Sequence, residues 1–311
     1  MPRSLASVIA SPELAPAPSL GDVADALIAW YARSARDLPW RRADFLAEFG
    51  GWGVLVSEFM LQQTPVARVI PRLSEWLERW PTPSSLAESA PADAVRAWAN
   101  LGYPRRALWL HGAARAIRDH HGGVVPDDVE ALLALPGIGD YTARAVAVFA
   151  YGRRHPVVDT NTRRVIARVL GGLSQPGPAA RSDLDDMAAL LPASIARAAV
   201  VNAAAMELGA VVCTSRRPEC DVCPLAHICL WRARGYPDTG DRRPRQAAYE
   251  GSDRQARGAA LRAIREAGDA GVRSDALIPD WPDSAQRDRA ILTLLSDGLI
   301  EERHGVFHLP G

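Results

Sequence analysis

Four cysteines set the strongest limit on how this chain can fold. Cys213, Cys220, Cys223 and Cys229 are its only cysteines, and their spacing is C-x6-C-x2-C-x5-C. A disulfide framework would spread cysteines through a small secreted domain, whereas four thiolates in one short loop can share one metal centre. The loop is therefore expected to fold around either a zinc ion, for which His227 could compete as a ligand, or an iron–sulfur cluster. The spacing alone does not decide between these two centres.

The residues before this loop are predicted to be almost entirely helical. Apolar residues recur three and four positions apart in ADALIAWYAR, PRLSEWLERW and ADAVRAWANL, and alternating β-branched runs are scarce. Segments rich in Pro, Gly and Ser, at residues 81–85, 122–126 and 171–178, separate the helices. The pattern predicts an all-α domain over residues 21–234, which includes the cysteine loop 213–229.

Three further segments complete the predicted organisation. Residues 1–20 contain several prolines and no long apolar run, so we expect a disordered segment rather than a signal or transit peptide. Residues 235–252 are polar and are predicted to form a linker. Residues 253–311 are expected to form a small winged-helix-like module, with helices near 254–267 and 284–297 and a hairpin in GLIEERHGVFHLP. No apolar run approaches the ~20 residues of a membrane span, so no membrane contact is expected.

The segment LPGIG, residues 135–139, predicts a tight turn between two helices. Pro136, Gly137 and Gly139 permit such a turn, with positive φ where it is needed. The N–H groups at the start of the next helix would then point outward and bind a phosphate without reading sequence. An ordinary interhelical loop could have the same composition, so the turn alone does not establish DNA binding.

About twenty residues further on, the segment VVDTN begins another helix. Asp159, considered by itself, is predicted to be the N-cap of that helix. Together with the LPGIG turn, however, the segment resembles the helix-hairpin-helix DNA glycosylase superfamily. The resemblance implies two helical subdomains, in which Asp159 faces the sugar of a flipped-out nucleotide and stabilises its oxocarbenium-like charge. It also favours a 4Fe-4S cluster over zinc, because the cysteine loop matches that of the superfamily.

Lysine is absent from the chain, and this narrows the reaction. All 36 basic residues are Arg, balanced by 36 acidic residues. Superfamily members that also cut the strand use a lysine just after the hairpin, where this chain has Tyr141. A side-chain Schiff base is therefore excluded, and the resemblance implies a monofunctional glycosylase that leaves an abasic site. Arginine pairs are expected to meet the DNA backbone; these pairs are 105–106, 153–154, 163–164 and 216–217.

The segment SEFMLQQT, residues 57–64, closely resembles the corresponding helix of MutY-type adenine glycosylases. It places Glu58 at an apolar helix start, where desolvation would raise the pKa of the carboxyl. A protonated Glu58 could then act as the general acid that protonates adenine at N7. Without the surrounding motif, a carboxylate paired with a cation or a helix dipole would be the simpler interpretation.

The same resemblance implies further site residues. Tyr141 and Asn161 would lie beside the sugar, and Trp40 and Arg41 near the adenine pocket. Gln63 and Tyr103 would wedge into the base stack where a nucleotide leaves it. Each has an ordinary alternative, since Trp40 and Tyr103 could be core aromatics and Gln63 a surface amide.

The resemblance covers about residues 21–234 and has three departures. Extra residues lie between Arg41 and Glu58, Trp52 stands at the aromatic position before the catalytic helix, and no Nudix-like domain follows the linker. We expect a monomeric, cytoplasmic, nucleoid-associated enzyme that removes adenine opposite 8-oxoguanine or guanine from double-stranded DNA. The alternatives are a mismatch thymine or uracil glycosylase and a non-catalytic iron–sulfur DNA-binding protein.

Overall fold

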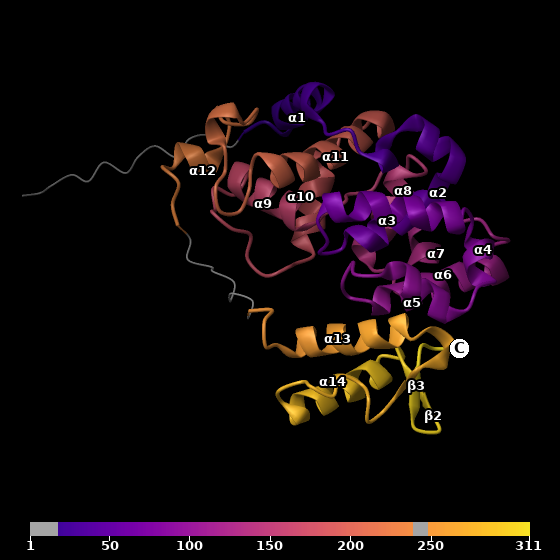
Figure 1. Ribbon diagram of the computed structural model, residues 1–311. Helices are drawn as coiled ribbons and strands as arrows, with labels where there is room; N and C mark the ends of the chain where they lie inside the picture. Colours follow the sequence, from indigo (N-terminus) through magenta and orange to yellow (C-terminus); the bar gives the residue numbers. More distant parts are fainter. Residues whose placement is uncertain (1–17, 239–247) are drawn as a thin grey trace, which may run out of the picture. The chain divides into compact units, whose positions relative to one another are not determined.

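The computed structural model describes residues 18–238 and 248–311. Most of the segment predicted to be disordered, 1–20, and half of the predicted linker, 235–252, lie outside the described residues. The described chain is mainly helical, as predicted, and its strands are confined to a small sheet near the C-terminus (Figure 1). No helix in the two described ranges is both long enough and apolar enough to cross a membrane.

The chain divides into two compact units, and each unit is built from two separate stretches of sequence. Of the described residues, one unit combines 18–35 with 156–238, and the other combines 36–155 with 248–311. Each unit has its own apolar core. We name them by their chemistry-bearing segments: the cysteine unit contains the four cysteines, and the hairpin unit contains the LPGIG turn.

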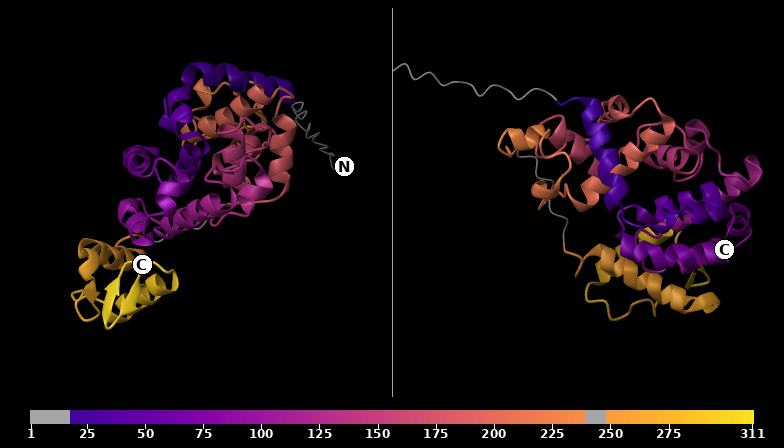
Figure 2. Two further views of the ribbon diagram at one scale, coloured as in Figure 1. Left: turned by 90° about the vertical axis from the view of Figure 1, so that its right-hand side faces the viewer. Right: turned by 90° about the horizontal axis from the view of Figure 1, so that it is seen from above.

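The cysteine unit is built around one long apolar helix. This helix, α11 (Ile195–Val211), buries a face of small and aliphatic residues and packs against two others, α1 (Leu20–Ser34) and α9 (Thr160–Val169). Helix α10 (Ser182–Leu190) covers α1 and α9. The cysteine loop follows α11 and contains only two short turns of helix, η2 (Cys220–Val222) and α12 (Leu230–Ala233). The two further views in Figure 2 show the same packing of α1 on α11.

The hairpin unit contains most of the helices. In chain order these are η1 (Pro39–Arg41), α2 (Ala43–Leu61), α3 (Val66–Arg79), α4 (Pro83–Ala87), α5 (Pro91–Trp98), α6 (Arg105–His120), α7 (Val129–Leu133) and α8 (Asp140–Phe149). Three tryptophans, on α3, just after it and on α5, stabilise its centre, because Trp76 meets Trp80 and Trp98 edge to face at ring distances of 4.7 and 5.7 Å.

Helix α2 contains the extra residues that the sequence shows before Glu58. They form its first turns, and the helix kinks at Gly50, where φ is +48° and ψ is −137°. Two neighbouring glycines allow close packing after the kink. A Cβ on Gly51 would overlap the hydroxyl of Tyr151, and one on Gly53 would lie 2.7 Å from the ring of Phe45. The insertion thus extends the helix that carries Glu58.

The C-terminal segment of the hairpin unit contains two helices and a three-stranded sheet. Helices α13 (Asp253–Glu266) and α14 (Ser284–Ser296) pack together, and the short turn η3 (Gly268–Ala270) follows α13. Strands β1 (Val272–Arg273), β2 (Glu301–Arg303) and β3 (Val306–His308) pair antiparallel in the order β1-β3-β2. Two helices and a hairpin lie at the predicted positions, and the winged-helix-like fold of this segment stays a prediction. We call residues 248–311 the C-terminal module; most of its buried apolar residues belong to the same core as those of α2 to α8.

Candidate functional site

The LPGIG turn joins α7 to α8 as predicted. Its two glycines occupy very different surroundings. Gly137 has φ +74°, and a Cβ there would lie 2.5 Å from the Cβ of Trp109, so both backbone and packing require glycine. Gly139 is the N-cap of α8 with φ −99°, and no atom lies within 4 Å of the position of its Cβ. Nothing inside the described chain therefore requires glycine at 139, and the outer side of the turn is open to an approaching backbone. Tyr141 follows in the first turn of α8, half-buried.

Asp159 is the N-cap of α9, as predicted. Its Oδ1 accepts hydrogen bonds from the backbone N–H groups of Asn161 at 2.9 Å and Thr162 at 2.7 Å. Its Oδ2 accepts a third, from the side-chain amide of Asn161 at 2.8 Å. Three donors on one carboxylate stabilise its negative charge and fix its direction. N-cap geometry and a role in charge stabilisation are thus compatible at this residue.

Asn161 connects Asp159 to the cysteine loop. The Asn161 Oδ1 accepts from Arg164 Nη2 at 2.8 Å, and the same guanidinium donates to the carbonyls of Cys213 at 2.7 Å and Gly209 at 2.6 Å. Helix α11 can approach this closely because a Cβ on Gly209 would lie 2.7 Å from Asn161. A continuous set of hydrogen bonds therefore runs from the Asp159 carboxylate to the backbone of the first cysteine.

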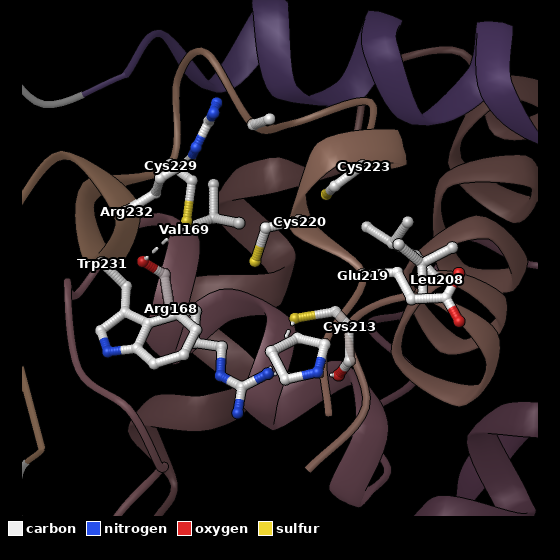
Figure 3. A pocket seen from close by; sticks show the side chains of 13 residues that line it. Arg168, Val169, Leu208, Cys213, Glu219, Cys220, Cys223, Cys229, Trp231 and Arg232 are labelled. Atoms are coloured by element: carbon white, nitrogen blue, oxygen red, sulfur yellow. Dashed lines mark hydrogen bonds between the residues drawn. The ribbon is translucent and has the colours of Figure 1, made fainter. Parts of the chain in front are cut away.

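The four cysteines line one pocket, together with Arg168, Val169, Trp231 and their neighbours (Figure 3). None of the four forms a disulfide, and all are partly buried. Burial raises the pKa of Cys223 to about 11, and it also raises the pKa of Cys229. Four thiolates this close together and this desolvated need positive charge among them, which bound iron ions supply.

The arrangement of the donors fits a cluster. All four cysteines line the same space. Arg168 contacts this space from one side, donating to Cys213 Sγ at 3.3 Å and lying 4.4 Å from the Trp231 ring.

The structure corrects the prediction that all the arginine pairs meet DNA. Arg106, Arg163 and Arg164 are each at most 8% exposed. Their guanidinium groups bind carbonyl and carboxylate oxygens of the protein instead. Such buried oxygens would be costly to leave without a donor, and the arginines satisfy them. Two pairs, 153–154 and 216–217, have both side chains exposed, so contact with DNA stays a prediction for these.

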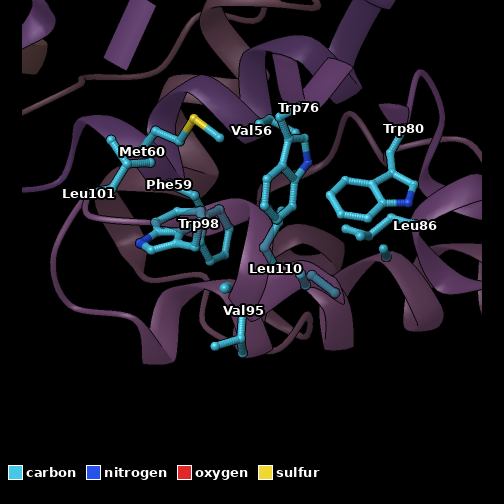
Figure 4. Close-up of a cluster of buried hydrophobic side chains, with 14 of the residues drawn as sticks. Val56, Phe59, Met60, Trp76, Trp80, Leu86, Val95, Trp98, Leu101 and Leu110 are labelled. Carbon is cyan, nitrogen blue, oxygen red and sulfur yellow. The ribbon is translucent and has the colours of Figure 1, made fainter. Parts of the chain in front are cut away.

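Glu58 lies in the last turn of α2, 5% exposed, and this corrects the predicted helix start. The preceding residues of the helix, from Gly51 on, are all buried, and Val56, Phe59 and Met60 point into the core (Figure 4). The predicted acid therefore lies in a buried, apolar part of the helix rather than at its start.

Trp40 and Arg41 lie on η1, which packs against α2. Trp40 is buried in the same core as the apolar residues around Glu58. Arg41 is half-buried beside it and donates to the carbonyl of Arg36 at 3.4 Å. The structure therefore places both residues next to the helix that carries the predicted acid.

Gln63 and Tyr103 are both exposed and both have an unusual backbone. Their φ values are +54° and +48°, in the left-handed region that non-glycine residues rarely adopt. Tyr103 is 50% exposed, so it is not a core aromatic. Strained backbone of this kind clusters at binding sites, where the surrounding contacts maintain it.

Arg106 joins the two loops that carry these side chains. From α6 it donates to the carbonyls of Phe59 at 2.8 Å and Gly102 at 3.0 Å, and to Thr64 Oγ1 at 3.3 Å. Burial lowers its pKa to about 10, so it is still a cation at neutral pH. The sequence interpretation treated Arg106 as a surface residue, although it shares the apolar face of α6 with Leu110, Ala113 and Ile117, at helical spacing.

Comparison with known proteins places these features in a family. Residues 56–183 match the model of the HhH-GPD superfamily base excision DNA repair protein, and residues 213–229 match the iron-sulfur binding domain of endonuclease III. The chain is 51% identical to the adenine DNA glycosylase of Mycolicibacterium smegmatis, over 92% of this chain and 95% of that protein. It is 50% identical to the adenine DNA glycosylase of Mycobacterium tuberculosis, over 92% of each.

A solved structure agrees in fold. A thermostable thymine-DNA glycosylase superposes with a TM-score of 0.61 at 24% identity, covering 68% of this chain and 95% of its own. The predictions of a helix-hairpin-helix fold and of an iron–sulfur cluster rather than zinc are confirmed. The chain belongs to the adenine DNA glycosylase family, DNA N-glycosylases of the HhH-GPD superfamily of base excision repair proteins, and its four cysteines form the iron–sulfur domain of that superfamily.

Proposed function

We propose that this protein is a monofunctional glycosylase that removes adenine paired with 8-oxoguanine or guanine in double-stranded DNA of the nucleoid. The observation that carries the proposal is the buried carboxyl of Glu58, inside a helix whose neighbouring residues are apolar. A carboxyl kept neutral at neutral pH can donate a proton, and adenine becomes a good leaving group once its N7 is protonated.

The two carboxyl groups divide the reaction. Glu58 donates its proton to N7 of adenine. The N-glycosidic bond then breaks, and the electron pair of that bond leaves with the base, which is neutral because it carries the added proton. Positive charge then develops on the sugar, and the ionised carboxylate of Asp159 stabilises it. Asn161 supports this role by fixing the carboxylate. Water then forms a bond to C1′ of the sugar and gives its proton to the Glu58 carboxylate, which regenerates the acid. Because Tyr141 stands where a lyase would need an amine, the product is an intact abasic strand.

The remaining predicted residues bind the substrate. Exposed Gln63 and Tyr103 fill the gap that the flipped adenosine leaves, and Trp40 with Arg41 shapes the pocket for the base. The N–H groups near Gly137 and Gly139 bind the DNA backbone. When bound, the iron–sulfur cluster holds the loop in shape, and the loop presents Arg216 and Arg217 to the phosphates.

A single-turnover assay tests the reaction. Duplexes with A:8-oxoguanine, A:G, T:G and U:G pairs are incubated with the cluster-containing protein, with and without alkali. We expect adenine release from the first two duplexes and strand breaks only after alkali. Breaks without alkali would contradict the monofunctional reaction, and release of thymine or uracil but not adenine would contradict the substrate.

Glu58→Gln tests the role of the acid. This variant keeps the size and hydrogen-bonding capacity of the side chain but cannot donate the proton, so adenine release should fall by at least about a hundredfold. Mismatch binding in a gel-shift assay should stay within about threefold. Glu48→Gln, at an exposed position on the same helix, is the matched control. Equal losses of release and of binding in Glu58→Gln would indicate that the residue only supports the fold.

A further inference from the structure

The loop between α5 and α6 has an unusual backbone. Ala99, which ends α5, and Tyr103, four residues later, both have φ +48°, and Gly102 between them has φ +86°. Three left-handed residues in a five-residue loop are unfavourable unless neighbouring groups hold them. We call residues 99–103 the Tyr103 loop.

Side chains hold this loop at every carbonyl. Each of its five consecutive carbonyl oxygens accepts at least one side-chain hydrogen bond, so the backbone is fixed along its whole length. Arg265 donates to the carbonyl of residue 99 and Arg68 to that of residue 100. Thr64 donates to the carbonyl of residue 101 at 3.2 Å. The carbonyl of residue 102 accepts from Trp98 at 2.9 Å and Arg106 at 3.0 Å, and that of residue 103 accepts from Arg106 at 3.4 Å. Four of these five donors come from α2 to α6 and the segments between them. The fifth, Arg265, comes from the C-terminal module.

Arg265 reaches the loop from the last turn of α13, which lies beside α5 in Figure 1. Its Nη1 donates to the carbonyl of Ala99, a residue 166 positions earlier in the chain. Arg265 is half-buried, and this burial lowers the pKa of its guanidinium. A cation at the C-terminal end of α5 is also favoured by that helix's dipole.

Further contacts fix the module on both sides of the loop. Arg96, in α5, pairs with Asp269 at 2.7 Å, and Arg105, in α6, pairs with Asp297 at 3.1 Å. Exposed ion pairs contribute little stability, but these two set the register of the module against the loop. Apolar packing contributes more to holding the module in place. Leu261 and Ile264 of α13 belong to the same core as the buried residues of α5 and Leu101 of the loop.

We propose that the C-terminal module braces the Tyr103 loop and that Arg265 is a positioning residue for mismatch recognition. Its hydrogen bond to Ala99 holds the strained backbone that presents Tyr103 to the base stack. The C-terminal module thus contributes to mismatch recognition through its contacts with the Tyr103 loop. This inference rests on the proposed function, in which Tyr103 enters the stack.

The experiment compares Arg265→Met with Arg265→Lys and Arg262→Met in the full-length, cluster-containing protein. Arg265→Met keeps the apolar stem and removes the donor, whereas Arg265→Lys restores a donor. Arg262→Met removes a charge from an exposed position on the same helix. Hydrogen exchange is followed at the amides of Ala99 and Leu101, which donate to the carbonyls of residues 96 and 98 at 3.1 and 3.2 Å and exchange only when the loop opens. Peptides of α3 and α11 report global unfolding.

We expect amide hydrogen exchange in the Tyr103 loop to be about tenfold faster in Arg265→Met, because the loop loses one hydrogen bond from a charged donor. Exchange should be unchanged in Arg262→Met, and slower in Arg265→Lys than in Arg265→Met. The dissociation constant for an A:8-oxoguanine duplex should rise about tenfold in Arg265→Met, while the rate of adenine release from the saturated complex changes less than about threefold.

Two results separate the brace from the proposed function. Unchanged loop exchange in Arg265→Met, alongside normal adenine release, would overturn the brace and leave the glycosylase assignment standing. Faster loop exchange with unchanged mismatch affinity would support the brace and contradict the wedge role of Tyr103. Exchange that accelerates equally in α3 would mean general destabilisation, and would also overturn a local brace.

Discussion

At the scale of single residues, the LPGIG turn separates two reasons for having glycine. Gly137 is enclosed, because its φ is positive and Trp109 occupies the space of a Cβ. Gly139 is open, with an ordinary φ and no neighbour within 4 Å of a Cβ. The first glycine serves the fold, and we expect the second to serve the approach of DNA.

Replacing each glycine by alanine should therefore affect a different property, stability for Gly137 and DNA binding for Gly139. Gly137→Ala should lower the free energy of unfolding by at least about 1 kcal/mol, because the left-handed backbone and the contact with Trp109 both oppose a Cβ. Gly139→Ala should leave thermal unfolding within about 2 °C of wild type but weaken binding to undamaged duplex DNA. Normal DNA affinity in Gly139→Ala would contradict the assignment of this turn to the DNA backbone.

At the scale of elements, Arg106 joins the end of α2 to the start of α6. The helix that carries Glu58 and the loop that carries Tyr103 meet at one guanidinium group. Because α2 ends at Leu61, its last carbonyls need donors, and Arg106 supplies them from another helix. The placement of Glu58 and that of Tyr103 are thus coupled through one side chain.

Arg106→Met should consequently affect both stability and recognition. Several buried carbonyls would lose their donor, and we expect a loss of about 3 kcal/mol in the free energy of unfolding, measured by urea titration. Arg105→Met, which removes a half-exposed neighbour, should cost less than about 1 kcal/mol. Equal losses in the two variants would show that the buried hydrogen bonds of Arg106 do not dominate its contribution.

Sequence reasoning succeeded where the physics is local. Helical spacing located the helices of the C-terminal module, and a polar residue before a helix identified the N-cap Asp159. It placed Glu58 at a helix start, whereas α2 carries this residue in its last turn, after the kink at Gly50. It also took Arg106 and Arg163 for surface residues, since their buried acceptors come from distant parts of the chain. The long-range contact of Arg265 has no signal in one sequence.

At the scale of the whole molecule, charge is distributed unevenly between interior and surface. The formal net charge is zero. The buried arginines form hydrogen bonds and ion pairs with carbonyl and carboxylate oxygens of the protein. Fewer cations are therefore available to DNA than the count of 36 basic residues implies. Long-range attraction to DNA should be modest, and local groups such as Arg216 and Arg217 should carry most of it.

The salt dependence of DNA binding measures this distribution. Replacing both Arg216 and Arg217 by Ala should reduce the slope of log affinity against log salt by about 1.8, or about 0.9 for each phosphate that is no longer neutralised. Arg154→Ala, at another exposed arginine, offers a comparison within the hairpin unit. An unchanged slope in the double variant would exclude the cysteine loop from the phosphate-binding surface.

The interleaving of the two units also has a consequence for synthesis on the ribosome. Helix α1 leaves the ribosome early, but the helix it packs against, α11, emerges about 175 residues later. The core around Trp76 and Trp98 likewise includes residues 260–309, which are translated after the entire cysteine loop. Because domains fold as units once their residues have emerged, neither core can close early during translation. The nascent chain must therefore expose unfinished apolar surfaces while the cysteine loop leaves the exit tunnel, and the hairpin unit can be completed only after that loop has emerged.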